Sequence, residues 1–263
     1  MSGEVRGRMD AVHAEQKDAG PQLAIVVPAW NEEAVIAQTI GQLREVAEAL
    51  GRPYELVVVD DASTDRTAAL AEAAGARVVR VEKRQIAAVR NAGARATRAP
   101  YLVFVDADTW VPETVLRHAL LELDAGAIGG GSRVAFDGRG HPLAESFFEA
   151  FKVLWYAQEL AAGCFLFARR DAFEAVGGFD ERWFAGEEYW LSRALKARGR
   201  FAFLHEEVVS SARKQRAGHG LGMMLRLLCL TAMFFAGYRR PLQSRERLGF
   251  WYDGTREGKP VDV

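Results

Sequence analysis

The sequence is poor in cysteine and has almost no net charge. The two cysteines, Cys164 and Cys229, are far apart and form no C-x-x-C pattern, so no disulfide framework and no cysteine metal site is predicted. Thirty-four Lys and Arg residues balance 35 Asp and Glu residues, and the net charge of −1 argues against a nucleic-acid-binding surface. The N-terminal residues contain no apolar core typical of a signal peptide, so we expect a cytoplasmic protein.

Two common phosphate-binding motifs are also missing. No G-x-G-x-x-G motif follows the first apolar run, and this absence disfavours a dinucleotide-binding fold. The sequence also lacks the G-x-x-x-x-G-K-[ST] motif, and this absence excludes a P-loop. The composition is otherwise ordinary for a globular protein, with 49% hydrophobic and 26% charged residues. A chain of 263 residues is long enough to bury a sizeable core.

Short apolar runs alternate with segments of helical periodicity along the first part of the chain. Each run is rich in β-branched residues, and each helical segment ends near a glycine or a polar turn. This alternation predicts an α/β fold with a mostly parallel sheet flanked by helices. The expected strands are 23–27 (stopped by Pro28), 54–59, 77–81 and 101–105, and the expected helices are 34–50, 64–74 and 85–97.

The most informative stretch is the run Tyr101–Val105 and the motif that follows it, Asp106-Ala107-Asp108. Two carboxylates one residue apart, at the end of a buried strand, would repel each other unless a cation lies between them. Oxygen ligands of this kind suit Mg²⁺ or Mn²⁺ rather than Zn²⁺. In open α/β sheets, ligands bind beyond the carboxyl ends of the strands, where this pair would lie.

The loops after two other strands carry complementary groups. Trp30 follows the first strand and Asp61 ends the second, so both would reach the same edge of the sheet as Asp106 and Asp108. A flat aromatic ring, an acid that can accept a base N–H, and a metal-binding pair together indicate a nucleotide-diphosphate site.

Five segments resemble family 2 glycosyltransferases of the GT-A fold. They are VVPAWNEE (26–33), VVVDDASTD (57–65), AVRNAGARAT (88–97), VFVDAD (103–108) and GGFDERWFAGEEYWLSRAL (177–195), and the resemblance extends over about 23–216. It implies a nucleotide-sugar donor, a divalent metal and inversion at the anomeric carbon. UDP is the favoured donor nucleotide, with GDP as the competitor.

The resemblance also assigns roles to individual residues. Trp30 would stack on the base, Asp61 would contact its edge, Arg90 would approach the diphosphate, and Asp108 would be the main metal ligand, with Asp106 facing the ribose or the waters of the metal. The full set expected to bind the nucleotide-sugar is Pro28, Trp30, Glu32, Asp60, Asp61, Arg90, Asp106, Ala107 and Asp108.

Glu187-Glu188 occupies the position of the acidic pair of the family. There the second acid takes the proton from the acceptor hydroxyl, so Glu188 is the expected general base, although Asp is commoner at this position. A helix N-terminus stabilised by two acids is the structural alternative. His205 is a candidate third metal ligand, against the default of a structural histidine.

The domain organisation is expected to be one continuous GT-A domain with additions at both ends. We predict a flexible tail over 1–20, a nucleotide-sugar-binding half over 21–135, an acceptor-binding and catalytic-base half over 136–220, and a C-terminal helical extension over 221–263. The apolar stretch in 221–240 has three interpretations: packing on the domain, peripheral contact with the cytoplasmic face of a membrane, or a homodimer surface.

The sequence therefore predicts a metal-dependent, inverting glycosyltransferase that moves one sugar to an acceptor hydroxyl. The acceptor could be a glycan, a lipid-linked molecule or a small molecule. A nucleotidyltransferase is one alternative, but it would want a basic, glycine-rich loop where this chain has Glu32 and Glu33. A non-catalytic nucleotide-sugar binder is another, and the complete set of acids argues against it.

Overall fold

The computed structural model describes residues 20–138, 149, 152–153, 155–211, 229–230, 233, 238, 240–244 and 246–248. The predicted N-terminal tail, apart from Gly20, and most of 221–240 lie outside these residues.

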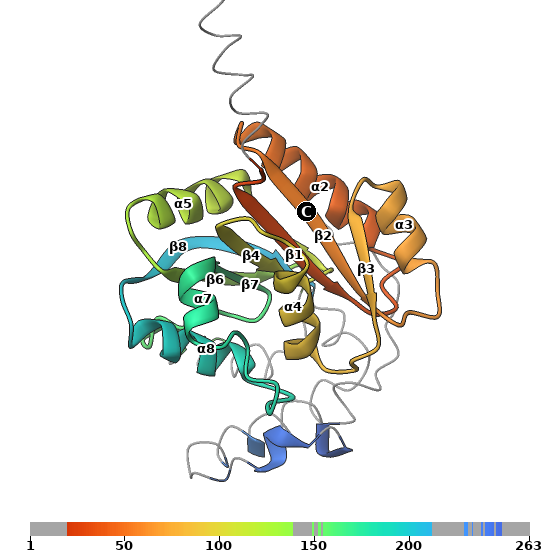
Figure 1. The fold of residues 1–263 in the computed structure, drawn as a ribbon. Coiled ribbons are helices and arrows are strands. Elements are labelled where there is room, and N and C mark those ends of the chain that lie inside the picture. The colour runs from red at the N-terminus through yellow and green to blue at the C-terminus, as the bar shows by residue number, and fades with distance from the viewer. Residues whose placement is uncertain are drawn as a thin grey trace, which may run out of the picture.

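The N-terminal half alternates strands and helices as the sequence predicts (Figure 1). Its elements are β1 (Leu23–Ala29), α2 (Ile36–Ala49), β2 (Tyr54–Asp61), α3 (Thr67–Ala73), β3 (Arg77–Val81), α4 (Ile86–Arg95), β4 (Tyr101–Val105), β5 (Thr109–Trp110) and α5 (Glu113–Asp124). The second half adds β6 (Gly129–Phe136), β7 (Phe165–Arg169), α7 (Arg170–Ala175), α8 (Glu187–Lys196) and β8 (Phe201–Ser210).

These strands form one eight-stranded sheet in the order β3-β2-β1-β4-β7-β6-β8-β5. The strands β3, β2, β1 and β4 are parallel, as predicted. β7 then runs antiparallel to both β4 and β6, and β8 is parallel to β6 but antiparallel to β5. The predicted α/β class with a helix-flanked central sheet is confirmed.

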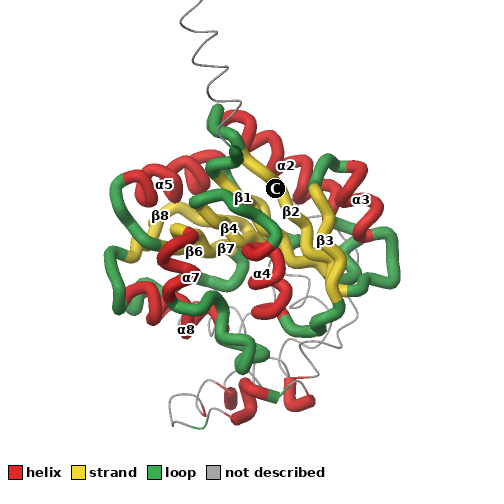
Figure 2. The backbone as a smooth tube through the Cα atoms, in the orientation of Figure 1, coloured by secondary structure: helices red, strands yellow, loops and turns green. Residues whose placement is uncertain are grey.

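Helices cover both faces of the sheet (Figures 1 and 2). One core cluster joins α2, α3 and α5 to one face, and includes Ile40, Val58 and Leu120. A second cluster joins α4, α7 and α8 to the other, and includes Val59 and Phe104. Because side chains alternate along a strand, consecutive residues at a strand end point to different helix layers.

The first strand is longer than predicted. The sequence places its end at Pro28, but β1 continues to Ala29 because it still pairs with β2 there, with Pro28 level with Val59. On its other side, pairing with β4 ends at Val26. A proline is tolerated where one side of a strand has no neighbouring strand, because its missing N–H is not needed there for a hydrogen bond.

Glycines in β6 allow close packing on β7 and β8. A Cβ added at Gly130 would lie 2.2 Å from the carbonyl oxygen of Ala202 and 2.2 Å from the ring of Phe167. These glycines lie at the start of β6, which runs from Gly129 to Phe136. The strands and side chains around Gly130 can pack this closely only because Gly130 has no side chain.

The described part of the C-terminal extension lies against the body. Two 3₁₀ turns, Arg240–Gln243 and Glu246–Leu248, are present, and the backbone N–H of Phe184 donates to the carbonyl of Leu242 at 2.8 Å. Leu248 is buried. Within the described residues, none of the helices combines the length and the apolar character that a bilayer crossing needs.

Candidate functional site

The loops that follow β1 and β2 are bonded to each other at the edge of the sheet. The N–H of Asn31 donates to Ser63 Oγ at 2.9 Å, and its side-chain Oδ1 accepts from the N–H of Thr64 at 2.8 Å. The N–H of Glu32 donates to Thr67 Oγ1 at 2.7 Å, and Glu32 is buried. The two loops therefore form one unit, as expected for a shared binding edge.

Three non-glycine residues of this edge have left-handed backbone conformations. Asn31 (φ 52°), Ala62 (φ 54°) and Arg84 (φ 52°) follow β1, β2 and β3 respectively. Such conformations cost free energy in a residue with a Cβ and are typical of functional loops. The guanidinium of Arg84 lies over the ring of half-buried Trp30, 5.1 Å from its centroid.

The paired acids at the end of β2 face opposite helix layers. Asp61 shares the face of Val59, beneath α4, and its Oδ1 accepts from the backbone N–H of Lys83 at 2.6 Å. Asp60 shares the face of Val58, and its buried Oδ1 has no hydrogen-bond partner among the described residues. The two predicted binding residues therefore serve different surfaces.

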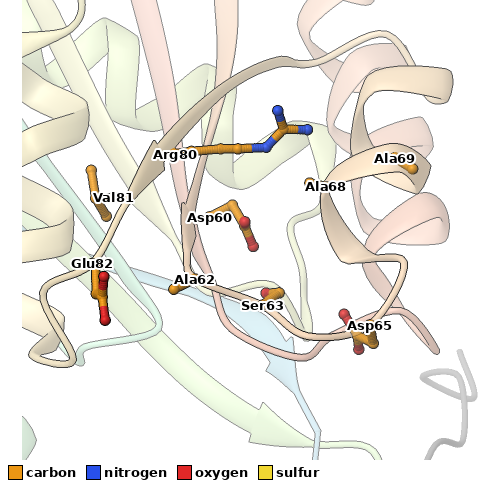
Figure 3. A pocket seen from close by; sticks show the side chains of 9 residues that line it. All are labelled: Asp60, Ala62, Ser63, Asp65, Ala68, Ala69, Arg80, Val81 and Glu82. Atoms are coloured by element: carbon orange, nitrogen blue, oxygen red, sulfur yellow. The ribbon is translucent and has the colours of Figure 1, made fainter.

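A cavity of about 630 Å³ opens on the side of Asp60 (Figure 3). It lies between the ends of β2 and β3 and the start of α3, with Arg80 on its wall. Of the predicted site residues, only Asp60 lines it.

The motif Asp106-Ala107-Asp108 forms a turn that is held from three directions. The N–H of Asp106 donates to the carbonyl of Cys164 at 3.2 Å, next to β7. The carbonyl of Ala107 accepts from Thr39 Oγ1 of α2 at 2.7 Å, and the carbonyl of Asp108 accepts from the N–H of Ser211 at 3.1 Å. The carboxylates thus project from a backbone that neighbouring elements fix.

Arg90 connects this motif to the acidic pair of α8. Its Nη2 donates to Asp106 Oδ1 at 2.8 Å and to the carbonyl of Gly163 at 2.7 Å, while its Nη1 donates to Glu187 Oε1 at 2.6 Å. Its side chain is only 3% exposed and lies over the ring of Phe179. Burial alone would lower the pKa of Arg90, but Asp106 and Glu187 raise it above its usual value, so the guanidinium stays charged.

Glu188 lies beside this group at the start of α8. A Cβ added at Gly163 would be 3.7 Å from the carboxyl carbon of Glu188 and 3.5 Å from Nη2 of Arg90, so the three residues meet at one point. Burial of the Glu188 carboxyl, followed by the charge of Glu187, raises its pKa to about 8. A carboxyl that titrates near neutral pH is suited to general acid–base chemistry.

The arrangement of strand-end loops, paired aspartates and a nearby acidic pair agrees with the comparison with known proteins. Residues 24–177, more than half of the chain, match the family Glycosyl transferase family 2. The chain belongs to this family.

Two curated relatives of this chain have different transferase names. It is 30% identical over 111 residues to undecaprenyl-phosphate 4-deoxy-4-formamido-L-arabinose transferase of Shewanella sediminis, which covers 40% of this chain and 34% of the relative. It is 36% identical over 93 residues to validoxylamine A glucosyltransferase of Streptomyces hygroscopicus subsp. jinggangensis, covering 33% of this chain and 22% of the relative. The chain thus spans about a third or less of the length of these two relatives.

Solved structures share the GT-A fold with this chain. A mannosyltransferase from Pyrobaculum calidifontis, in complex with GDP-Man and Mn²⁺, superposes with a TM-score of 0.60 at 20% identity, covering 89% of this chain and 73% of the other. Residues 1–349 of TarS from S. aureus, in complex with UDP-GlcNAc, superpose with a TM-score of 0.58 at 17% identity and the same coverage.

Asp106 and Asp108, the side chains predicted to bind a metal ion, form only part of a ligand set. Among the described residues, no three His, Cys, Asp or Glu side chains gather in a metal-binding group. Asp106 and Asp108 nevertheless fit an ion such as Mn²⁺ or Mg²⁺, which completes its shell with water and phosphate oxygens. His205 is exposed on β8, against Phe203, and stays a prediction as a ligand.

Asn91 of α4 and Gln85, the residue that caps the N-terminus of α4, position the loop before the acidic pair of α8. Asn91 exchanges hydrogen bonds with the backbone of Phe179, donating at 2.8 Å and accepting at 2.9 Å. Gln85 donates to the carbonyls of Glu181 and Trp183 at 3.0 and 2.7 Å. They hold the loop before α8. Only the match of Asn91 to a family motif marked it, and no sequence signal marked Gln85.

Proposed function

We propose that the protein is a metal-dependent, inverting glycosyltransferase that moves one sugar from a nucleotide-diphosphate donor to an acceptor hydroxyl. The observation that carries the proposal is the buried Arg90, which joins Asp106 of the D-x-D motif to Glu187 of the acidic pair. This link places the groups expected to bind the donor next to the group expected to activate the acceptor.

Each side chain has one task in this proposal. Trp30 stacks on the base and Asp61 accepts a hydrogen bond from its edge. Asp106 and Asp108 would hold Mn²⁺ or Mg²⁺, and the metal would supply positive charge that offsets the negative charge growing on the departing diphosphate. Glu188 accepts the proton of the attacking hydroxyl while the sugar changes its anomeric configuration.

The donor nucleotide is proposed to be UDP, with GDP as the competing choice. The base would enter on the side of Asp61, where Lys83 already fixes one oxygen of the carboxylate. The names of the relatives favour a lipid-linked acceptor or a small-molecule acceptor, and we favour the lipid-linked one because the undecaprenyl-phosphate transferase matches over more of this chain. Membrane association at the cytoplasmic face follows from that choice.

The test combines binding and slow donor hydrolysis. UDP-, GDP- and dTDP-sugars are compared by thermal shift and by release of the nucleotide diphosphate, each with Mn²⁺ and with EDTA. We expect one donor to stabilise the fold and to be hydrolysed only with metal. Asp108→Asn should abolish the metal-dependent part, whereas Asp124→Asn, which alters a surface ion pair with Arg52, should not.

Two outcomes would contradict the proposal. If a donor binds without any turnover in the wild type and with a range of acceptors, the protein is a nucleotide-sugar binder. If no donor shifts the melting temperature with metal present, the assignment of the donor site is wrong.

A further inference from the structure

Arg133 is a partly buried cation that forms no ion pair with any residue that the structure describes. The Nε of its guanidinium is buried and has no hydrogen-bond partner among the described residues. The ring of Tyr156 lies beside it, with its centroid 5.9 Å from the guanidinium carbon. Because arginine cannot lose its proton in proteins, the guanidinium keeps a positive charge that an anion could bind.

The side chain points to the face of the sheet that carries α8. Val134, the next residue, belongs to the core cluster under α2 and α5, so Arg133 faces the opposite side. On that side, a Cβ at Gly131 would touch Ala161, whose N–H donates to Ser192 of α8 at 3.2 Å. Ser192 lies one turn after Glu188 on the same helix.

Arg133 also lies at the same end of the sheet as the D-x-D motif. Phe136, three residues later on β6, is level with Ser210 of β8, and Ser210 is in turn level with Thr109, which directly follows Asp108. Arg133 therefore lies on the same face of the sheet as α8, which carries Glu188, and at the same end of the sheet as Asp108.

In the part of the chain that the structure describes, the charged residues near Arg133 form no ion pair with its guanidinium. Glu207 is the register partner of Arg133 on β8, but it is exposed and forms no ion pair with it. Lys152 is one turn before Tyr156 and is paired with Glu149 at 2.6 Å. Tyr156 is itself fixed, because its hydroxyl contacts the N–H and the carbonyl of Val134 at 2.9 and 3.3 Å.

We propose that Arg133 forms a subsite for a phosphate group of the acceptor. An arginine fork can donate two parallel hydrogen bonds to phosphate oxygens, and the partial burial of Arg133 strengthens such bonds. The subsite would select acceptors whose phosphate lies close to the position that Glu188 activates. The proposal rests on the proposed function, since it needs this face to be the acceptor side.

The test separates the subsite from the donor site. Wild type, Arg133→Gln, Arg133→Lys and the surface control Arg117→Gln are saturated with UDP and Mn²⁺ and titrated with farnesyl phosphate, glucose 6-phosphate and farnesol. We expect the wild type to bind at least one phosphate ester more tightly than farnesol. Arg133→Gln should weaken that binding by about tenfold or more, as expected for losing a charge-assisted hydrogen bond, and Arg133→Lys should weaken it less. Preference for farnesyl phosphate over glucose 6-phosphate would identify a lipid headgroup as the source of the phosphate, and the reverse a soluble ester.

Two further measurements make the result specific. Arg133→Gln should melt at the same or a higher temperature than the wild type, because a partly buried charge that forms no ion pair among the described residues is removed, whereas loss of a structural arginine would lower the melting temperature. Its affinity for UDP and its donor hydrolysis should be unchanged. Equal binding of phosphate esters by wild type and Arg133→Gln would overturn the subsite, and so would weaker binding of UDP, because Arg133 would then belong to the donor site. Absence of donor hydrolysis in the wild type would instead contradict the proposed function, independently of the phosphate titration.

Discussion

Nη1 of Arg90 lies 2.6 Å from Oε1 of Glu187, and both side chains are almost completely buried. The same guanidinium contacts Asp106 at 2.8 Å, so one cation balances an acid from each half of the domain. The resemblance to the family predicts that Arg90 approaches the donor diphosphate. In the structure, the contacts of Arg90 instead favour a role in positioning Asp106 and Glu187. An approach of Arg90 to the diphosphate stays a prediction.

Replacing this arginine should destabilise the fold. Arg90→Gln leaves two carboxylates without their cation, and removing one partner of a buried ion pair typically costs about 3–5 kcal/mol of unfolding free energy. Arg117→Gln, which breaks an exposed pair with Glu113 on α5, should cost less than about 1 kcal/mol. Urea unfolding of both variants measures the difference. Equal losses of unfolding free energy would show that Arg90 contributes no more to stability than an exposed arginine does.

Glu188→Gln should separate binding from chemistry. The amide keeps the shape of the side chain but cannot accept the proton, so we expect turnover to fall by about 10²–10⁴-fold while the affinity for the donor changes little. Glu174→Gln, an exposed acid of α7, is the matched control. Steady-state kinetics with the active donor tests this, and a Glu188→Gln variant with wild-type turnover excludes the general-base assignment.

The raised pKa of Glu188 predicts how stability depends on pH. Burial and then Glu187 raise this pKa from 4.5 to about 8, so the folded protein binds a proton more tightly than the unfolded chain does. The contribution of this group to the stability of the metal-free protein should therefore be greatest below about pH 4.5, and should decline as the pH rises towards about 8. Unfolding titrations in EDTA measure this contribution as the difference between the wild type and Glu188→Gln, which should lack it. Identical profiles would contradict the raised pKa.

Two glycines should respond in opposite ways to alanine. Gly41 is inside α2 with nothing within 4 Å of an added Cβ, so Gly41→Ala should stabilise the protein by about 0.5–1 kcal/mol. At Gly130 the added atom would collide with the Ala202 carbonyl and the Phe167 ring, and Gly130→Ala should destabilise by about 2 kcal/mol or more. Thermal or urea unfolding compares them directly, and a neutral Gly130→Ala would mean that β6 is packed less closely than described.

The sequence predicted the local parts of this fold better than its long-range contacts. The strand Tyr101–Val105 and the turn that follows could be read from hydrophobic pattern and charge, because both signals are local. The antiparallel insertion of β7 between β4 and β6 could not, since nothing in the residues of β7 states its direction.

The site shows the same division. Asp106 and Glu188 were proposed as site residues from motifs, whereas the bonds of Arg90 to Asp106 and Glu187 join residues that are 16 and 97 positions apart in the sequence. Gln85 and Arg133 were missed for a related reason. Their importance depends on what faces them in the folded protein, and the sequence contains no motif for that.

The hydrogen bonds between the loops after β1 and β2 have a consequence for redesign of donor preference. The N–H of Thr64 donates to Oδ1 of Asn31 across the two loops, and the N–H of Glu32 donates in the opposite direction to Oγ1 of Thr67. A loop transplanted alone from a relative would lose these partners and leave polar groups unmatched. Segments 30–33 and 62–67 should therefore be exchanged as a single cassette, and a chimera that carries both should express and fold where either single exchange fails.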